Sequence, residues 1–400
     1  MRSFIYTLFL ALPLLFARCK TIKTVKILKS GEAAQKNYKE QISFESRAGL
    51  ILLKVQVNKK DYNFIFDSGA PNCVTKELAQ ELNLKPVVNQ KAVDAEGKTG
   101  GIEFVRVDEI KLGRITFLNT AAAVIDLKQV PELACLKVDG LIGGNLMRKA
   151  CWQLDYIKKT LVFSSSLDSL GVPAGAAVMS FSPELSGTPI VEVELENMKM
   201  GGNIFDTGST GNITLSAGAF KKLQKQNPSL KYLKGVGSNS AGLYGQGFDT
   251  SYLAKTNLKM GSLALPGRVV EFKRDKGNLG SDFFKEFIVT MDWKQKKIFF
   301  VPQPAASAEW KTFGFSSFKS KDKLIVSFLI ENSPAANAGL RQGDEILAIN
   351  GKSYANLSAD EYCSLVVHSA PWRKEDKLQI TVKQAGGTEK TVTLLKENPF

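Results

Sequence analysis

Two short strings in this chain each place an aspartate, a hydroxyl residue and a glycine at the end of an apolar run. Asp67 follows the run at 63–66, and Asp206 follows a similar run at 203–205. One such string alone would be an ordinary turn sequence. Two copies could bring two carboxyl groups face to face, where they would share a single proton. The strings are Asp67-Ser68-Gly69-Ala70 and Asp206-Thr207-Gly208-Ser209.

A pair of carboxyl groups that shares a proton has the chemistry needed to hydrolyse an amide with water. Two carboxylates about 3 Å apart cannot both ionise. The charged partner can remove a proton from water while the neutral partner protonates the carbonyl oxygen. Gly69 and Gly208 would let the two loops turn tightly and approach each other. The strings therefore predict a catalytic dyad of Asp67 and Asp206 that needs neither a metal nor a cofactor.

The two strings differ three residues after the aspartate, where Ala70 in the first corresponds to Ser209 in the second. A hydroxyl group at that place could donate a hydrogen bond to the outer oxygen of Asp206. Because a donor favours the charged form of a carboxylate, we predict that Asp206 is the more ionised partner. Asp67 would then carry the shared proton.

The regions around the two strings repeat each other along the chain, which indicates an internal duplication. A helix pattern follows each string, with Thr75 expected to cap residues 76–82 and Ser216 expected to cap residues 217–223. Each half then closes with an apolar-Gly segment and a strand–turn–strand pattern. The matched closing segments are 139–147 with 277–284, and 154–163 with 291–300.

This double pattern resembles the aspartic peptidases of the pepsin and retropepsin superfamily over roughly residues 45–303. In that family each half is a β-rich lobe with one Asp-Ser/Thr-Gly loop, and a later apolar-apolar-Gly segment braces the loop. The resemblance implies a mainly β fold, with two homologous acid-protease β-barrel lobes that form a central cleft. Asn278 departs from the apolar pattern of the second brace. The braces would be Leu141-Ile142-Gly143 and Asn278-Leu279-Gly280.

The same resemblance assigns supporting roles around the dyad. The hydroxyl groups of Ser68 and Thr207 would form hydrogen bonds across the two loops and so determine their spacing. The complete supporting set would be Ser68, Gly69, Thr207, Gly208 and Ser209.

Hairpins that could cover a cleft are less distinct. Pepsin-like enzymes place a Tyr over the substrate in the first lobe, but residues 76–110 contain no Tyr. This segment offers a tip around Gly97, and the second half offers one around Tyr244. These tips could be lids that exclude water, or ordinary surface turns.

The last hundred residues carry a different pattern, with an expected strand at 324–330. Ser-Pro-Ala-Ala and Ala-Gly-Leu follow within 333–340, and Gly-Asp-Glu-Ile-Leu and Ile-Asn-Gly follow within 343–351. This string strongly resembles a PDZ domain. Such domains capture a peptide carboxylate on a loop and add the peptide as a strand beside a helix. The resemblance implies the loop Phe313-Gly314-Phe315 and a helix at 359–367, whether this copy binds peptide tails or only packs on the peptidase.

Other hydrolytic chemistries lack their usual residues. The only histidine in the chain, His368, lies outside the duplicated region, so those halves cannot hold a Ser-His-Asp triad or a His-rich metal site. A serine peptidase with a PDZ domain is therefore a remote alternative. The cysteines beyond Cys19 form no Cys-x-x-Cys pair, which argues against zinc. Cys135 and Cys151 are close enough for a disulfide in an oxidising compartment, and the alternative is two buried thiols.

The N-terminus has the features of an export signal. Arg2 precedes an apolar run at 4–16 that is too short to span a bilayer. We expect a signal peptide at 1–19 and a protein exported to the periplasm, to the cell surface or into the medium. Cys19 could carry a lipid anchor, although Arg18 is not the small residue that such sites prefer.

Charge and composition complete the expected organisation. The formal net charge of +14 comes from lysines spread along the chain, which favours a solvated basic surface or association with anionic envelope polymers. No nucleic-acid-binding motif accompanies it. The expected divisions are a signal peptide at 1–19, a Lys-rich linker or pro-segment at 20–44, peptidase lobes at 45–170 and 171–303, and a PDZ domain at 304–400.

Two functions fit these observations. The first is an exported aspartic endopeptidase that cleaves peptides or proteins, with the PDZ domain recruiting substrate or regulating access. The second is a catalytically silent envelope adaptor, in which the peptidase lobes are a scaffold and the PDZ domain binds peptide C-termini. Intact Asp-hydroxyl-Gly strings favour the first, although a fold alone does not establish a function.

Overall fold

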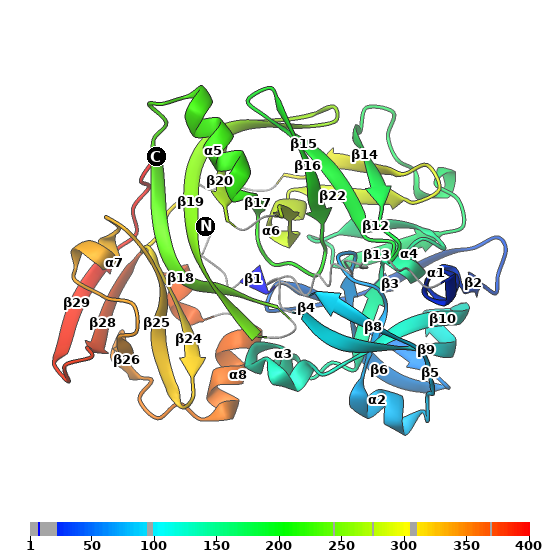
Figure 1. Ribbon diagram of the computed structural model, residues 1–400, viewed down its shortest axis with the longest axis horizontal. Helices are drawn as coiled ribbons and strands as arrows, with labels where there is room; N and C mark the ends of the chain where they lie inside the picture. Colours follow the sequence, from blue (N-terminus) through cyan, green and yellow to red (C-terminus); the bar gives the residue numbers. More distant parts are fainter. Residues whose placement is uncertain are drawn as a thin grey trace.

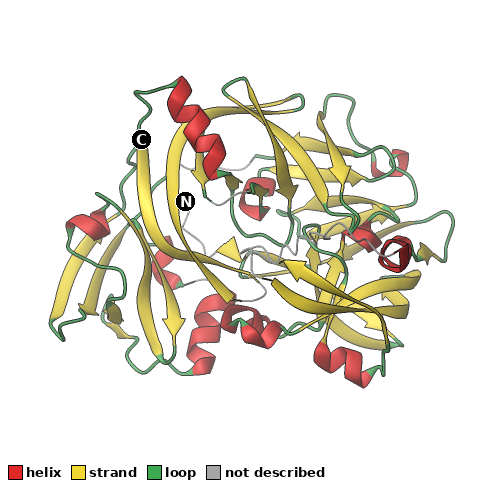
Figure 2. Cartoon of the chain, in the orientation of Figure 1, coloured by secondary structure: helices red, strands yellow, loops and turns green. Residues whose placement is uncertain are grey.

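The structure is a computed structural model that describes residues 7–8, 22–93, 99–242, 245–273, 276–304, 310–368 and 370–400. β-strands make up most of it, and short helices pack between and against the sheets (Figures 1 and 2). The expected mainly β class is therefore confirmed. None of the helices in these ranges is long and apolar enough to cross a membrane. Cys19 and nearly all of the expected signal peptide lie outside the described residues.

The first half builds a sheet around the loop of Asp67. Strands β5 and β6 form a hairpin, and β6 ends at Asp67, where the parallel strand β11 places Gly143 opposite it. The long β9–β10 hairpin packs beside them. The strands are β2 (Glu32–Ala33), β4 (Glu45–Arg47), β5 (Leu50–Val57), β6 (Lys60–Asp67), β7 (Cys73–Thr75), β8 (Pro86–Val93), β9 (Thr99–Leu112), β10 (Ile115–Ile125) and β11 (Gly140–Gly143).

The second half repeats these pairings around Asp206. Strands β15 and β16 form the hairpin, and the parallel strand β21 places Leu279 opposite Phe205. The strands are β15 (Pro189–Leu195), β16 (Met198–Phe205), β17 (Ile213–Leu215), β18 (Tyr232–Gly242), β19 (Gly245–Met260), β20 (Leu263–Phe272) and β21 (Asn278–Leu279); β1 (Thr7–Leu8) pairs with β18.

Both predicted helix caps are confirmed. The hydroxyl of Thr75 accepts a hydrogen bond from the Leu78 N–H, and that of Ser216 accepts one from the Ala219 N–H. Each satisfies a backbone donor that the first helical turn leaves free. The helices are α1 (Ile22–Lys29), α2 (Lys76–Glu81), α3 (Pro131–Leu136), α4 (Gly144–Met147), α5 (Ala217–Gln226) and α6 (Ser281–Phe284), with 3-10 turns at Leu127–Gln129 and Asp168–Leu170.

An antiparallel sheet shared by both halves joins them, in the order β3-β13-β12-β22-β23-β14. Its two hairpins, β12–β13 and β22–β23, are the matched strand–turn–strand segments. Asp155 closes the first turn and Asp292 the second, each carboxylate accepting backbone N–H groups two and three residues on. The strands are β3 (Lys39–Ser43), β12 (Cys151–Asp155), β13 (Thr160–Ser164), β14 (Ala177–Pro183), β22 (Phe287–Asp292) and β23 (Lys297–Pro302).

Residues 22–44, interpreted above as a linker or pro-segment, are built into this fold. Ile27 and Leu28 of α1 are buried in the apolar cluster of the first half. β2 pairs with β10, and β3 forms the edge of the shared sheet against β13. The segment is thus a structural part of the described chain.

The C-terminal region forms the expected PDZ domain around its own apolar core. The predicted strand and helix occur as β25 and α8. Ser358 and Glu361 cap the start of α8 reciprocally, because each side chain accepts a hydrogen bond from the backbone of the other. The elements are β24 (Phe315–Ser320), β25 (Lys323–Ile330), α7 (Pro334–Asn337), β26 (Glu345–Ile349), β27 (Lys352–Ser353), α8 (Ala359–His368), a 3-10 turn (Pro371–Lys374), β28 (Lys377–Lys383) and β29 (Glu389–Leu395).

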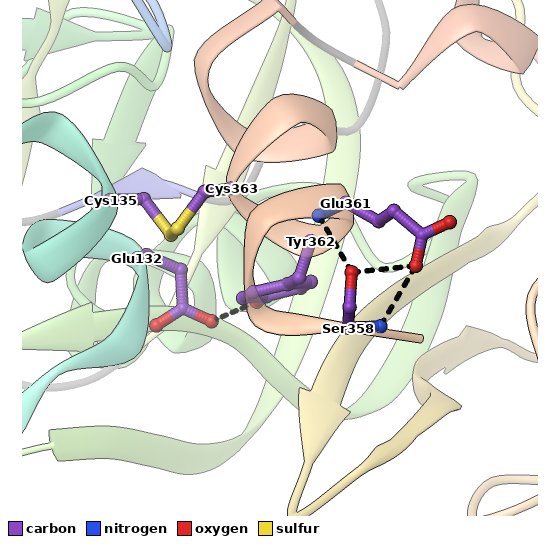
Figure 3. The surroundings of a disulfide bond; sticks show 6 residues. All are labelled: Glu132, Cys135, Ser358, Glu361, Tyr362 and Cys363. Carbon is purple, nitrogen blue, oxygen red and sulfur yellow. Dashed lines mark hydrogen bonds between the residues drawn. A yellow bond between two sulfur atoms is a disulfide. The ribbon is translucent and has the colours of Figure 1, made fainter. Parts of the chain in front are cut away.

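A disulfide joins the first half to the PDZ domain, and it corrects the pairing considered above. Cys135 in α3 is bonded to Cys363 in α8, while Cys151 is a buried thiol on β12 (Figure 3). Sequence proximity favoured Cys151, but β12 lies in the shared sheet whereas α3 packs against α8. The pairing was decided by tertiary contact, which spacing does not show.

Peptide mapping should establish this pairing. When unreduced protein is denatured, alkylated and digested, we expect the Cys135 and Cys363 peptides to remain linked. Cys73 and Cys151 should carry the alkyl label, because both are free thiols. In the control variant Cys363→Ser, Cys135 should become alkylated as well. A peptide linked through Cys151 would contradict the structure.

Candidate active site

The two Asp-hydroxyl-Gly loops meet and are held together by reciprocal hydrogen bonds. The Ser68 N–H donates to Thr207 Oγ1 at 2.9 Å, and the Thr207 N–H donates to Ser68 Oγ at 3.0 Å. Each hydroxyl then donates to a backbone carbonyl of the opposite loop, Ser68 to Phe205 at 2.7 Å and Thr207 to Phe66 at 3.0 Å. All of these groups are buried, so the loops have one strongly preferred spacing.

The two glycines allow the carboxyl groups to approach the opposite loop. A Cβ atom on Gly69 would lie 2.5 Å from Cγ of Asp206, and one on Gly208 would lie 2.3 Å from Cγ of Asp67. Neither loop could therefore carry a side chain there. Both aspartates have no solvent exposure, and the Gly69 and Gly208 N–H groups donate to Asp67 and Asp206 respectively, each at 2.8 Å.

The predicted braces lie directly under these loops. Gly143 pairs with Asp67 across β11 and β6, and its N–H donates to the side chain of Asn72 at 2.7 Å. In the second half the Asp206 N–H donates to the Leu279 carbonyl at 2.9 Å, and Gly280 packs against the backbone of the second loop. The remaining brace residues, Leu141 and Ile142, are buried in the first half.

Asn278 supplies the hydrogen bond that was assigned above to Ser209. Its Nδ2 donates to Oδ2 of Asp206 at 2.8 Å. The Ser209 hydroxyl instead accepts the Gly211 N–H at 3.4 Å, so the Ser209 assignment is replaced. Leu141 takes the corresponding place in the first half and has no donor. The signal for this role was present in the sequence as a polar residue in an otherwise apolar brace, but it was interpreted as a weakness.

The unequal surroundings of the two carboxyl groups separate their pKa values. Burial, followed by the charge of Asp206, raises the pKa of Asp67 well above its usual range. Burial also raises the pKa of Asp206, but the Asn278 hydrogen bond opposes this and holds it at about 6. Within the described part of the chain, nothing donates a hydrogen bond to Asp67 Oδ2. This arrangement favours the proton on Asp67 and the charge on Asp206.

A buried polar cluster that the sequence did not reveal adjoins the second loop. Oε1 of Glu271 accepts from Asn239 at 3.0 Å and from Ser251 at 2.8 Å, and Lys273 lies 3.2 Å from Oε2. Burial alone would raise the pKa of Glu271, but Lys273 and these donors hold it below its usual range. The cluster has no counterpart at the matching ladder positions of the first half. There Cys73 corresponds to Thr214, Ala123 to Glu271 and Leu141 to Asn278.

The other predicted site residues lie elsewhere. Gly97 and Tyr244, the possible covering hairpin tips, fall outside the described residues. In the PDZ domain Phe313 and Phe315 are buried, and Gly314 has a φ of 85° and packs against Ser333. The Gly314 N–H donates to the Thr312 hydroxyl at 2.9 Å, so this donor of the expected carboxylate loop is engaged internally.

A functional site could also be a metal-binding cluster or a cavity outside the dyad of Asp67 and Asp206. Among the residues that the structure describes, no cluster of His, Cys, Asp or Glu could hold a metal ion. A cavity of about 730 Å³ lies away from the dyad, between α2 and the β8–β9 strands, and Lys76, Gln90 and Glu103 are among its lining residues.

Two known family models match parts of this chain. An aspartyl protease family model matches residues 53–146, which contain the Asp67 loop and its brace, and a PDZ domain model matches residues 307–394. The chain thus carries an aspartyl-protease-type domain and a C-terminal PDZ domain.

The similar curated proteins are named as serine proteases, not as aspartyl proteases. Proteins described as probable CtpA-like serine protease occur in Staphylococcus aureus strains MRSA252 and bovine RF122 / ET3-1. They are 29% and 28% identical over 150 and 146 residues, respectively 37% and 36% of this chain. Since these segments are 26% of each relative, the chain spans about a quarter of the length of the curated relatives it matches. Among solved structures, conglutin gamma, a basic 7S globulin from lupine seeds, aligns with 66% of this chain and 95% of its own at 12% identity and a TM-score of 0.40.

Replacing Thr207 tests the hydrogen bonds between the loops. Thr207→Val keeps the side-chain shape but leaves the buried Ser68 N–H and Phe66 carbonyl unpaired, at about 1–3 kcal/mol each. We expect the free energy of urea unfolding to fall by roughly 2–6 kcal/mol. Thr207→Ser retains the hydroxyl and should cost about 1 kcal/mol for the lost methyl group. Equal unfolding midpoints for the two variants would contradict this role of the hydroxyl.

Proposed function

We propose that this protein is an aspartic endopeptidase, which hydrolyses peptide bonds with a water molecule activated by Asp67 and Asp206. The observation that carries the proposal is the pair of buried, facing carboxyl groups whose surroundings push their pKa values apart. Groups separated in this way suit the roles of acid and base in one reaction. The match of residues 53–146 to an aspartyl protease family supports the same chemistry.

In the proposed reaction Asp206 acts as the base and Asp67 as the acid. The Asp206 carboxylate removes a proton from water, and the water oxygen bonds to the carbonyl carbon. Asp67 gives its proton to the carbonyl oxygen, which produces a neutral tetrahedral diol. The C–N bond then breaks as Asp206 returns its proton to nitrogen and one diol hydroxyl returns a proton to Asp67. The products are an acid and an amine, and the dyad again holds one proton.

Serine protease chemistry, suggested by the names of the curated relatives, has less support in this chain. Its one histidine, His368, ends α8 in the PDZ domain, so a histidine base in the peptidase halves is impossible. The relatives are matched over only 26% of their length, which leaves most of each protein without a counterpart here.

We also propose that the protein is exported and that the PDZ domain binds peptide C-termini, as a site for substrate recruitment or control. The disulfide between Cys135 and Cys363 supports an oxidising compartment. The apolar run at 4–16 supports a signal peptide. The PDZ match supports recognition of an extended peptide by strand addition.

A peptide library tests the aspartic mechanism directly. We expect the mature protein to cleave a mixed library between acid and neutral pH. Asp67→Asn and Asp206→Asn should each lower the rate by roughly 10²–10⁴-fold, because each removes an acid or a base. Asp322→Asn, at an exposed position of the PDZ domain, is the matched control and should retain activity. Full activity in either dyad variant would refute the mechanism, and a wild type that binds peptides without cleaving them would favour the adaptor.

The pH profile tests the role of Asn278. A donor lowers the pKa of Asp206, so removing it should raise that pKa above about 6. Asn278→Leu, which copies Leu141 of the first half, should move the acid limb of the rate profile to higher pH. The shift should be roughly one to two units, the equivalent of a charged hydrogen bond. Ser209→Ala should leave the acid limb at the same pH. A shift in Ser209→Ala together with no shift in Asn278→Leu would show that Ser209 is the donor.

A further inference from the structure

The PDZ domain is joined to the second half through a continuous β-ladder. Phe328 and Leu329 of β25 pair with the PDZ strand β24 on one side, and Phe328 to Ile330 pair with residues 235–237 of β18 on the other. The Glu331 N–H extends this contact by donating to the Lys234 carbonyl at 2.7 Å, and their side chains form an ion pair. Over these three residues β18 lies beside β25, and Figure 1 shows the two strands as neighbours there. The hairpin of β18 and β19 is thus part of the PDZ sheet.

Two glycines make this ladder close. A Cβ atom on Gly235 would lie 2.3 Å from the ring of Phe328, and one on Gly237 would lie 2.1 Å from the Ser327 carbonyl oxygen. Phe328 and Ile330 form a small apolar cluster with Leu253 of β19. The contact is therefore a packed junction that a single methyl group would disturb.

A PDZ domain binds its peptide between a strand and a helix, here expected to be β24 and α8. The helix α8 is fixed to the first half. Cys363 of α8 is bonded to Cys135 of α3, and the Tyr362 hydroxyl donates to the buried carboxylate of Glu132 (Figure 3). Near the C-terminal end of α8, the Val367 carbonyl accepts the Ala48 N–H at 3.1 Å. These contacts hold α8 against the half that carries Asp67.

The expected carboxylate loop, Phe313 to Phe315, is attached to the end of β25 and to α7. The Phe313 carbonyl accepts the Ala335 N–H at 3.0 Å, and the Gly314 carbonyl accepts the Ile330 N–H at 2.8 Å. The loop is thereby bonded to the end of β25 that pairs with β18. A peptide bound between β24 and α8 would contact one wall attached to each peptidase half.

We infer that the PDZ groove is an effector site, at which a peptide with a free C-terminal carboxylate changes the rate of the peptidase. This inference rests on the proposed aspartic peptidase function. A bound peptide can shift the protein only if it binds one arrangement of the groove walls better than another. Since those walls belong to different halves of the peptidase, a change in their spacing would alter how the two halves meet.

A short chain of contacts connects the ladder to the dyad. Asn239, two residues beyond the ladder on β18, donates to Glu271 at 3.0 Å. Thr214 on β17 donates to the same carboxylate at 3.5 Å and lies opposite Asn278 in the β17–β21 ladder. Asn278 donates to Asp206. Packed and hydrogen-bonded elements of this kind can carry coupling between sites.

The test uses effector peptides that are not themselves cleaved. Heptapeptides ending in Val, Leu or Phe are added to the full-length mature protein, with the same peptides bearing C-terminal amides as controls. Binding is measured by fluorescence anisotropy, and cleavage is measured on a substrate with an amidated C-terminus. We expect at least one free-acid peptide to bind and to change kcat/KM roughly 5- to 150-fold, the usual range of coupling between sites. The amides should do neither.

Hydrogen exchange provides a second readout that does not need catalysis. Peptide binding should change the exchange of amides in β18 and α3, outside the groove. Altered exchange in a protein that cleaves nothing would preserve the inference and refute the proposed function. Binding that alters neither exchange nor rate would overturn the inference, and so would the absence of binding by every free-acid peptide.

Two variants test the two attachments separately. Gly235→Ala should weaken the junction with Phe328 and reduce the effector response, with Gly201→Ala as the control because its Cβ meets open space. The double variant Cys135→Ser/Cys363→Ser releases α8 from α3 and should reduce the response as well, whether or not Gly235→Ala folds. A full response in the folded disulfide variant and in Gly235→Ala would overturn the proposed route.

Discussion

The structure depends on the reciprocal hydrogen bonds between Ser68 and Thr207, which hold two buried carboxyl groups in one place. Burying a carboxylate is costly unless its charge is neutralised or hydrogen-bonded. Here the cost is lowered in two ways. The raised pKa of Asp67 favours its neutral, protonated form, and the Gly208 N–H and Asn278 donate hydrogen bonds that stabilise the charge on Asp206. The braces, the shared sheet and the glycines without room for a Cβ all maintain that arrangement.

The two halves have the same strand pairings but different polarity beside the dyad. Leu141 in the first brace corresponds to Asn278 in the second, and Ala123 corresponds to Glu271. This difference provides a physical reason for two chemically identical groups to take different roles. The second half, with its polar residues beside the dyad, is also the half that pairs with the PDZ sheet, so the hydrogen-bonded cluster at Glu271 lies between that ladder and Asp206.

The sequence predicted the features that depend on local patterns. The caps at Thr75 and Ser216 follow from local helix-start patterns, whereas the mainly β class and the PDZ elements follow from the resemblance of the motifs to known families. The pairing of Cys135 with Cys363 and the cluster at Glu271 could not be predicted, because they bring together residues far apart in the chain. Asn278 could have been predicted had the polar residue in an apolar brace been interpreted as a donor. The packing of residues 22–44, part of the predicted linker or pro-segment, was not foreseen, because lysines conceal the two apolar residues that α1 buries.

NMR of the full-length protein with ¹³C-labelled aspartate carboxyl groups can show whether Asp67 and Asp206 share one proton. We expect one aspartate carbon to titrate well above the ordinary pKa of an aspartate, and its signal to be lost in Asp67→Asn. A second should titrate near pH 6 and be lost in Asp206→Asn. If every aspartate carbon titrated near the ordinary value of about 4, the carboxyl groups would ionise independently, which is incompatible with a shared proton.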